Sequence, residues 1–142
     1  MNEKFAELYQ KVMLEHARTP HNFGEPDDFS AVGEGDNPMC GDSFKVFVKL
    51  NGDLVSSAAF TGAGCAVSKS SASVMTEQVK GKSVEEIKSL FEQFQQLVNG
   101  DVKPEEADEG LGDLLAFTGI AEFPVRVQCA VLAWEALIKA LG

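Results

Sequence analysis

The stretch that decides the fold is residues 43–60, SFKVFVKLNGDLVSSAAF. In its first half every second residue is apolar (Phe44, Val46, Val48 and Leu50) and alternates with Ser43, Lys45, Phe47 and Lys49, which is the period of a half-buried strand. Asn51-Gly52 predicts a tight hairpin turn because both residue types tolerate positive φ, and residues 54–60 return as the partner strand. The segments before and after this hairpin should therefore lie at the same end of the sheet.

Cysteines stand on both sides of the hairpin. Cys40 precedes it in NPMCGD, Cys65 follows it in TGAGC, and a third cysteine, Cys129, ends the run PVRVQC near the C-terminus. The hairpin predicts that the Cys40 and Cys65 loops lie side by side. Gly41 lets the backbone turn sharply beside Cys40, so the carboxylate of Asp42 can reach whatever that thiol binds.

The local sequence around these thiols differs from that of most buried cysteines. Cys40 lies in a Pro/Gly loop, and Cys65 begins a helix, where the helix dipole favours thiolate over thiol. Thiolates with one carboxylate suit a tetrahedral zinc or iron site, although no Cys-x-x-Cys pair is present. The residues alone leave open a metal–thiolate site, a reactive thiol, or three structural cysteines.

Apolar residues recur at helical spacing in five further segments: residues 3–18, 65–80, 83–99, 111–118 and 124–141. Pro20 stops the first segment, Gly81 stops the second, and Pro124 suits the first position of the last. A weak signal for an edge strand covers residues 29–35. Serines at 68, 70, 71 and 73 lower helix propensity but allow another backbone to approach closely.

Length and charge narrow the functional classes. A chain of 142 residues, 44% apolar and 24% charged, is expected to form a single globular domain over residues 1–142. A formal charge of −10 disfavours nucleic acid and anionic membranes as partners, so it reflects either solubility or a partner with a basic surface. Nothing at the N-terminus is typical of a signal peptide, no apolar run would span a bilayer, and three cysteines do not form an even disulfide set, so a cytoplasmic location is expected.

Two polar regions have open roles. His16 and His21 flank the end of the first helix, where a histidine is more often a surface or capping residue than a ligand. Residues 101–112 crowd acidic side chains around Lys103 and Pro104, which predicts an exposed, solvated loop or a partner-docking segment.

Three cysteine motifs in this order carry a resemblance to a known family. NPMCGD, FTGAGCAVSKSSASVMTEQVKGKS and FPVRVQCAVLAWEAL, together with the N-terminal YQKVMLEHARTPHNFG, resemble the IscU/NifU-type iron–sulfur cluster assembly proteins over nearly the whole chain. The resemblance implies a compact α+β domain, in which a three-stranded antiparallel sheet packs against about five helices and a metal site lies at one tip.

Departures from the scaffold members point to the SufU branch. Gln128 stands where the scaffold branch has a histidine before the third cysteine, EFPVR replaces the chaperone-recognition motif, and an acidic insertion lengthens the step to Cys129. For that branch the resemblance implies zinc held by Cys40, Asp42, Cys65 and Cys129, with Cys40 as persulfide acceptor. Arg126 would stabilise nearby negative charge or contact a partner, or is a plain surface arginine.

Two functions follow from the resemblance. One is a zinc-bound sulfur acceptor, a sulfurtransferase-like partner of a SufS-like cysteine desulfurase rather than a stand-alone enzyme, which passes sulfur to a downstream scaffold or apo iron–sulfur protein. The other is a scaffold that assembles a [2Fe–2S] cluster, or binds iron, on the same ligands. A structural zinc domain without chemistry is the third alternative.

Overall fold

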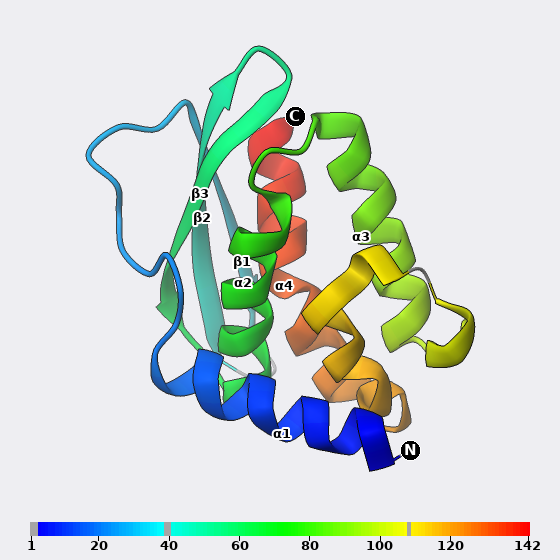
Figure 1. Ribbon diagram of the computed structural model, residues 1–142. Helices are drawn as coiled ribbons and strands as arrows, with labels where there is room; N and C mark the ends of the chain where they lie inside the picture. The colour runs from blue at the N-terminus through cyan, green and yellow to red at the C-terminus, as the bar shows by residue number, and fades with distance from the viewer. Residues whose placement is uncertain (1–2, 39–40, 108) are drawn as a thin grey trace.

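A three-stranded antiparallel sheet forms one side of the molecule. The computed structural model describes residues 3–38, 41–107 and 109–142, and within them β1 (Ala31–Asn37), β2 (Asp42–Asn51) and β3 (Leu54–Ala63) follow in the order β1-β2-β3 (Figure 1). Asn37 pairs with Asp42, and Ser43 pairs with Ala63. The start of β2 and the end of β3 therefore meet at one edge, as the hairpin predicted, and the end of β1 joins them there.

The hairpin turn lies one residue later than predicted. Asn51 pairs with Leu54, so Gly52 and Asp53 form the turn, and of the two only Gly52 has a positive φ. The pairing also shifts between Lys49 and Leu50. Asn51 thus ends a strand, and the glycine alone supplies the left-handed conformation that this connection needs.

The α-helices begin and end at the predicted signals. They are α1 (Glu3–Arg18), α2 (Ala66–Val79), α3 (Val84–Val98) and α4 (Pro124–Leu141). Ser83 and Glu86 form a reciprocal capping box at the start of α3, and Pro124 is in the first turn of α4. The backbone hydrogen bond from Ser83, followed by that of its side chain, lowers the pKa of the Glu86 carboxyl.

The segment after α3 differs most from the prediction. A helix over residues 111–118 was expected, whereas 3₁₀ turns run through η1 (Pro104–Glu106) and η2 (Glu109–Glu122), with a kink at Gly112. Leu111, Leu114 and Phe117 of η2 are fully buried. The helical turns therefore continue to residue 122, beyond the predicted end at residue 118. Burial of these side chains in the core stabilises the turns, although the segment lacks a regular helical period.

The helices cover one face of the sheet in layers (Figure 1). α4 packs against β1 and β2, α2 packs against β3 and α4, and α3 and η2 close the far side, while α1 lies across α2 and η2. Gly33 allows the closest approach, since a Cβ there would stand 1.9 Å from the carbonyl oxygen of Ala136. This contact fixes α4, and with it Cys129, against the sheet.

α1 and α2 meet through a buried polar contact. His16 is 3% exposed, and its Nδ1 lies 2.7 Å from Ser73 Oγ. Burial, and after it the neighbouring His21, lowers the pKa of His16. His16 is therefore an interior polar residue that joins two helices, and the prediction of a surface residue was wrong for it.

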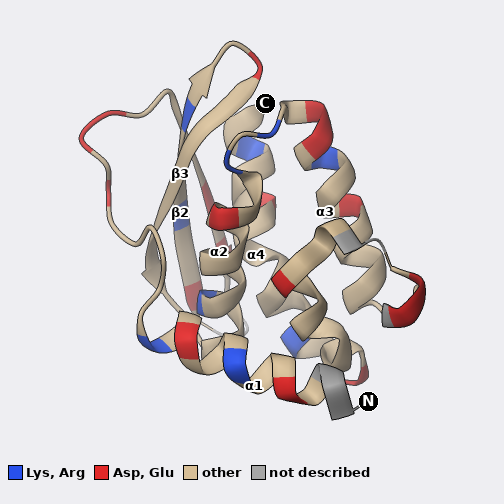
Figure 2. Cartoon of the chain, viewed as in Figure 1, with Lys and Arg blue, Asp and Glu red and all other residues tan. Residues whose placement is uncertain are grey.

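Acidic side chains are spread over the outer surface of the helices and loops (Figure 2). The segment that follows α3 is acidic there, and Asp101, Glu105 and Glu106 are all exposed. In the part of the chain that the structure describes, no helix is long and apolar enough to cross a membrane.

Candidate metal centre

Cys65 occupies the N-cap of α2, and its sulfur serves as the cap. Its backbone is extended (φ −71°, ψ 170°), and Sγ accepts a hydrogen bond from Ser68 N at 3.5 Å. Ser68 Oγ donates to Cys65 O at 3.0 Å and lies 3.5 Å from Sγ. Gly64 is needed just before it, because a Cβ would stand 2.4 Å from Ser68 Oγ. The cysteine side chain is thus held by the first turn of the helix while the residue itself stays exposed.

Asp42 approaches Cys65 from the first position of β2. The residue is 3% exposed, and its Oδ1 accepts a hydrogen bond from Cys65 N at 3.1 Å. The Cys65 thiol donates to Oδ2 at 3.8 Å. A buried carboxylate needs partners of this kind. One carboxylate oxygen is engaged by the backbone, and the other faces the sulfur.

Cys129 reaches the same place from the second turn of α4. It is 3% exposed, and its ligand atom lies with those of Asp42 and Cys65 in a group whose members are within 4.8 Å of one another. Ser71 Oγ donates to Ala130 O at 2.6 Å, which joins α2 to α4 beside this group. The close approach that the serines predicted therefore occurs next to the site.

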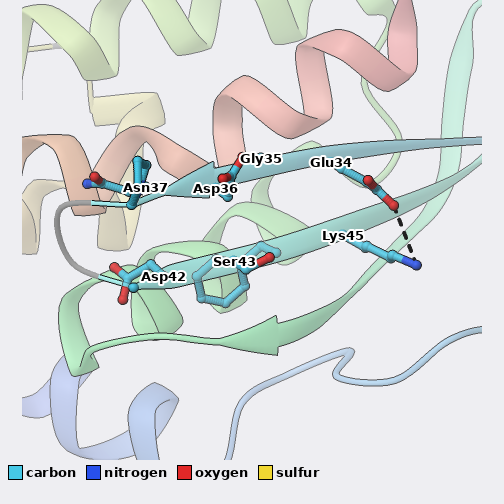
Figure 3. Close-up of a pocket in the computed structure, with 10 residues that line it drawn as sticks. Glu34, Gly35, Asp36, Asn37, Asp42, Ser43 and Lys45 are labelled. Carbon is cyan, nitrogen blue, oxygen red and sulfur yellow. Dashed lines mark ion pairs between the residues drawn. The ribbon is translucent and has the colours of Figure 1, made fainter.

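Cys40 lies outside the described residues, so its predicted place in the site stays a prediction. The residues around its loop are described: Asn37 ends β1, Asp42 begins β2, and both line a hollow of about 330 Å³ at this edge of the sheet (Figure 3). Glu34 and Lys45 form an ion pair of 3.4 Å on the same hollow. The loop that carries Cys40 thus starts and ends beside the Asp42–Cys65–Cys129 group.

Arg126 is exposed in the first turn of α4, one turn before Cys129. Its guanidinium lies 4.9 Å from the ring centre of Phe123. Arg126, Cys65 and Cys129 line a mostly apolar groove of about 380 Å³, to which Tyr9, Met13, Ala66, Val67 and Val125 also contribute. The groove was not foreseen from the sequence, because its walls come from α1, α2 and α4 and no local pattern connects them.

The donor set is suited to a soft or borderline metal ion. Sulfur ligands around a tetrahedral zinc stand about 3.8 Å apart, given metal–sulfur bonds of about 2.3 Å. The ligand atoms of Asp42, Cys65 and Cys129 lie within 4.8 Å of one another. They would therefore need to move inward by only about 1 Å to reach this spacing. Two thiols and one carboxylate fill three positions of a tetrahedron and leave one for a further ligand.

Comparisons with known proteins show the family to which the chain belongs. The sequence profile of the NifU-like N terminal domain matches residues 8–142. The chain is 39% identical over 141 residues to the zinc-dependent sulfurtransferase SufU of Bacillus subtilis (strain 168), covering 99% of this chain and 94% of that protein. It is 41% identical over 138 residues to the iron–sulfur cluster assembly scaffold protein IscU of Streptococcus pyogenes serotype M1, covering 97% and 85%.

Solved structures share the fold. FiSufU, a SUF-system protein from the thermophile Fervidobacterium islandicum AW-1, superposes with a TM-score of 0.85 at 30% identity, over 96% of this chain and 98% of that one. The N-terminal part of a NifU-like protein from Brucella abortus gives a TM-score of 0.84 at 21% identity, over 95% and 92%, which supports the fold alone. Together with the profile match, these likenesses show that the chain belongs to the NifU-like N-terminal domain family of iron–sulfur cluster assembly proteins.

Proposed function

We propose that this protein is a zinc-bound sulfur acceptor that receives persulfide sulfur from a cysteine desulfurase during iron–sulfur cluster assembly. The observation that carries the proposal is the group formed by Asp42, Cys65 and Cys129 beside the ends of the Cys40 loop. Gln128 supports it, since an amide stands where the scaffold branch has a histidine. The likeness to a zinc-dependent sulfurtransferase points in the same direction.

Cys40, Asp42, Cys65 and Cys129 would hold the zinc. When bound, zinc keeps its cysteine ligands as thiolates, which are the nucleophilic form of sulfur. Asp42 is oriented for this role because the Cys65 N–H engages Oδ1 and leaves Oδ2 toward the sulfurs. Cys129 is buried, whereas Cys65 is exposed, so the polypeptide covers one side of the site and leaves the other side open.

Cys40 is the proposed acceptor. Its thiolate attacks the outer sulfur of the desulfurase cysteine persulfide, forming a new sulfur–sulfur bond to Cys40. The sulfur–sulfur bond of the desulfurase persulfide breaks, and its cysteine leaves as a thiolate. No net oxidation or reduction occurs, because one persulfide is exchanged for another.

A partner desulfurase would dock beside this site. Phe123 and Val125 are 48% and 56% exposed next to Arg126 and the apolar groove. Exposed apolar side chains that adjoin a charged one are typical of a protein contact surface. Sulfur would then pass to a cluster scaffold or an apo iron–sulfur protein, in the cytoplasm, where thiols stay reduced.

Desulfurase turnover tests the proposal. Adding the wild-type protein to a SufS-type desulfurase with cysteine should raise the rate of alanine release, and Cys40→Ser should abolish the rise and the persulfide mass increment. Ser43→Ala, on the exposed side of β2, is the matched control and should stimulate like wild type. Undiminished stimulation by Cys40→Ser would refute the assignment of Cys40.

The second candidate is a scaffold that assembles a [2Fe–2S] cluster on the same four residues. The likeness to the Streptococcus pyogenes scaffold IscU supports it. Metal analysis of anaerobically purified protein separates the two. One colourless zinc per chain supports sulfur acceptance, whereas stoichiometric iron and sulfide with visible charge-transfer bands supports the scaffold.

A further inference from the structure

The only two histidines of the sequence meet on a part of α2 that lies away from Cys65. The ring centres of His16 and His21 are 4.4 Å apart, although one residue lies on α1 and the other follows the helix. Glu15 lies beside the two rings, and one ligand atom from each of the three residues is within 4.8 Å of the ligand atoms of the other two. Both rings are tied to α2 at residues 73 and 77, which lie roughly 12–18 Å along the helix from residue 65 at about 1.5 Å per residue.

Partners on α2 orient both imidazole rings. His16 Nδ1 lies 2.7 Å from Ser73 Oγ, and His21 Nδ1 lies 3.1 Å from Glu77 Oε1. The main chain of His21 is fixed as well, since its N–H donates to Ser73 Oγ at 2.7 Å. When a hydroxyl or carboxylate engages one ring nitrogen, the other nitrogen is the one that binds a metal, and its orientation and basicity are set by that partner.

We propose that His16, His21 and Glu15 form a second divalent-metal site, with Glu77 and Ser73 as positioning residues. The Nε2 atoms of the two histidines and a Glu15 carboxylate oxygen would be the ligands. Two imidazoles and one carboxylate suit zinc and its neighbours in the first transition series. This site is independent of the proposed sulfur acceptance, because it uses no cysteine.

The ion pair between Glu15 and His21 already brings two of the proposed ligands together. His21 Nε2 is 3.5 Å from Glu15 Oε1, so a ligand nitrogen and a ligand oxygen already face each other. His16 is buried, whereas the side chains of Glu15 and His21 are 52% and 34% exposed. The site therefore has one rigid interior ligand and two outer ligands that can close on an ion entering from solvent.

Titration of the full-length protein with Zn²⁺ tests the proposal. After one equivalent has been bound at the cysteine site, a second equivalent should bind with a stoichiometry near one, measured by calorimetry. In a long-range ¹H–¹⁵N spectrum, the imidazole nitrogen signals of both histidines should shift with the second equivalent. The first equivalent should leave them in place.

Substitutions assign the ligands. His21→Gln and Glu15→Gln should each weaken the second binding event by at least tenfold, and Glu77→Gln should weaken it by about 10–100-fold through loss of the Nδ1 partner. Glu7→Gln is the matched control, because Glu7 is an exposed carboxylate on the same helix, two turns before Glu15. It should bind the second equivalent like wild type.

Cys65→Ser separates this site from the cysteine centre. The histidine signals should respond to Zn²⁺ in that variant as they do in the wild type, whether or not sulfur transfer survives. A second binding event that persists unchanged in His21→Gln, or histidine signals that stay unshifted at two equivalents, would overturn the proposal. Failure of Cys40-dependent desulfurase stimulation would leave it untouched.

Discussion

The bond between Ser71 and Ala130 allows a measured test of how α2 and α4 hold the site together. Ser71 is fully buried, and its hydroxyl donates to the Ala130 carbonyl of α4, the residue after Cys129. Ser71→Ala removes the donor. Ala130 O keeps its place in the α4 hydrogen-bond ladder, so the expected loss is that of one net hydrogen bond, about 1 kcal/mol.

Ser70→Ala provides the reference for this measurement. Ser70 is equally buried on the same helix, but its hydroxyl donates at 2.6 Å to Ala66 O within that helix, with the thioether of Met13 as a weak second acceptor. Both variants gain roughly 0.5 kcal/mol from the higher helix propensity of alanine. A serine hydroxyl that bonds the carbonyl four residues earlier in its own helix adds little stability, so the difference between the variants reports mainly the bond from α2 to α4.

Urea unfolding with a chelator present is the assay. Ser71→Ala should be less stable than Ser70→Ala by about 1 kcal/mol, or about 3–5 °C in melting temperature for a chain of this size. The chelator removes bound metal, so that the measured free energy of unfolding reports the hydrogen bond and not metal binding. Equal stabilities for the two variants would refute the reasoning that this bond anchors α2 to α4.

Three further predictions concern packing, pH and metal. Gly33→Ala should lower the free energy of unfolding by about 2–3 kcal/mol, because its Cβ would meet backbone of α4 that cannot rotate away; an unchanged melting temperature would contradict this close packing. The pKa of Glu86 is lowered in the folded protein, so its carboxylate stabilises the fold above the ordinary pKa, and this stabilisation is lost as the pH falls through the pKa of the folded state. Glu86→Gln should remove this part of the pH dependence of the melting temperature. Chelation of the metal at the cysteine centre should lower the stability by about 4 kcal/mol if free metal exceeds the dissociation constant 1,000-fold, and Cys65→Ser protein should show a smaller loss.

Local sequence signals were enough to predict most of the elements. The alternation in β2 and the capping residues of α3 act between neighbours, so their pattern is visible without the fold. The hairpin then predicted that the segments before β2 and after β3 lie side by side, because strand pairing follows from the turn. The inclusion of Asp42 and Cys129 in the same site came from the family resemblance, because nothing local relates α4 to the hairpin.

Contacts between distant segments could not be predicted in this way. Ser73 is 57 positions from its partner His16, so the sequence gives no sign that one buried polar residue satisfies the other. The helical turns after Gly112 depend on burial of Leu114 and Phe117 in the core rather than on periodicity. In both cases tertiary packing, which no local pattern encodes, decides the conformation.

The use of a sulfur atom to cap α2 links the chemical state of Cys65 to the first turn of the helix. Ser68 N donates to Sγ, and a thiolate accepts such a bond more strongly than a thiol. Alkylation, metal loss or a persulfide on Cys65 would each alter the strength of this cap. The exchange rate of the Ser68 amide proton is therefore a reporter of the sulfur, which can be read in solution without a label.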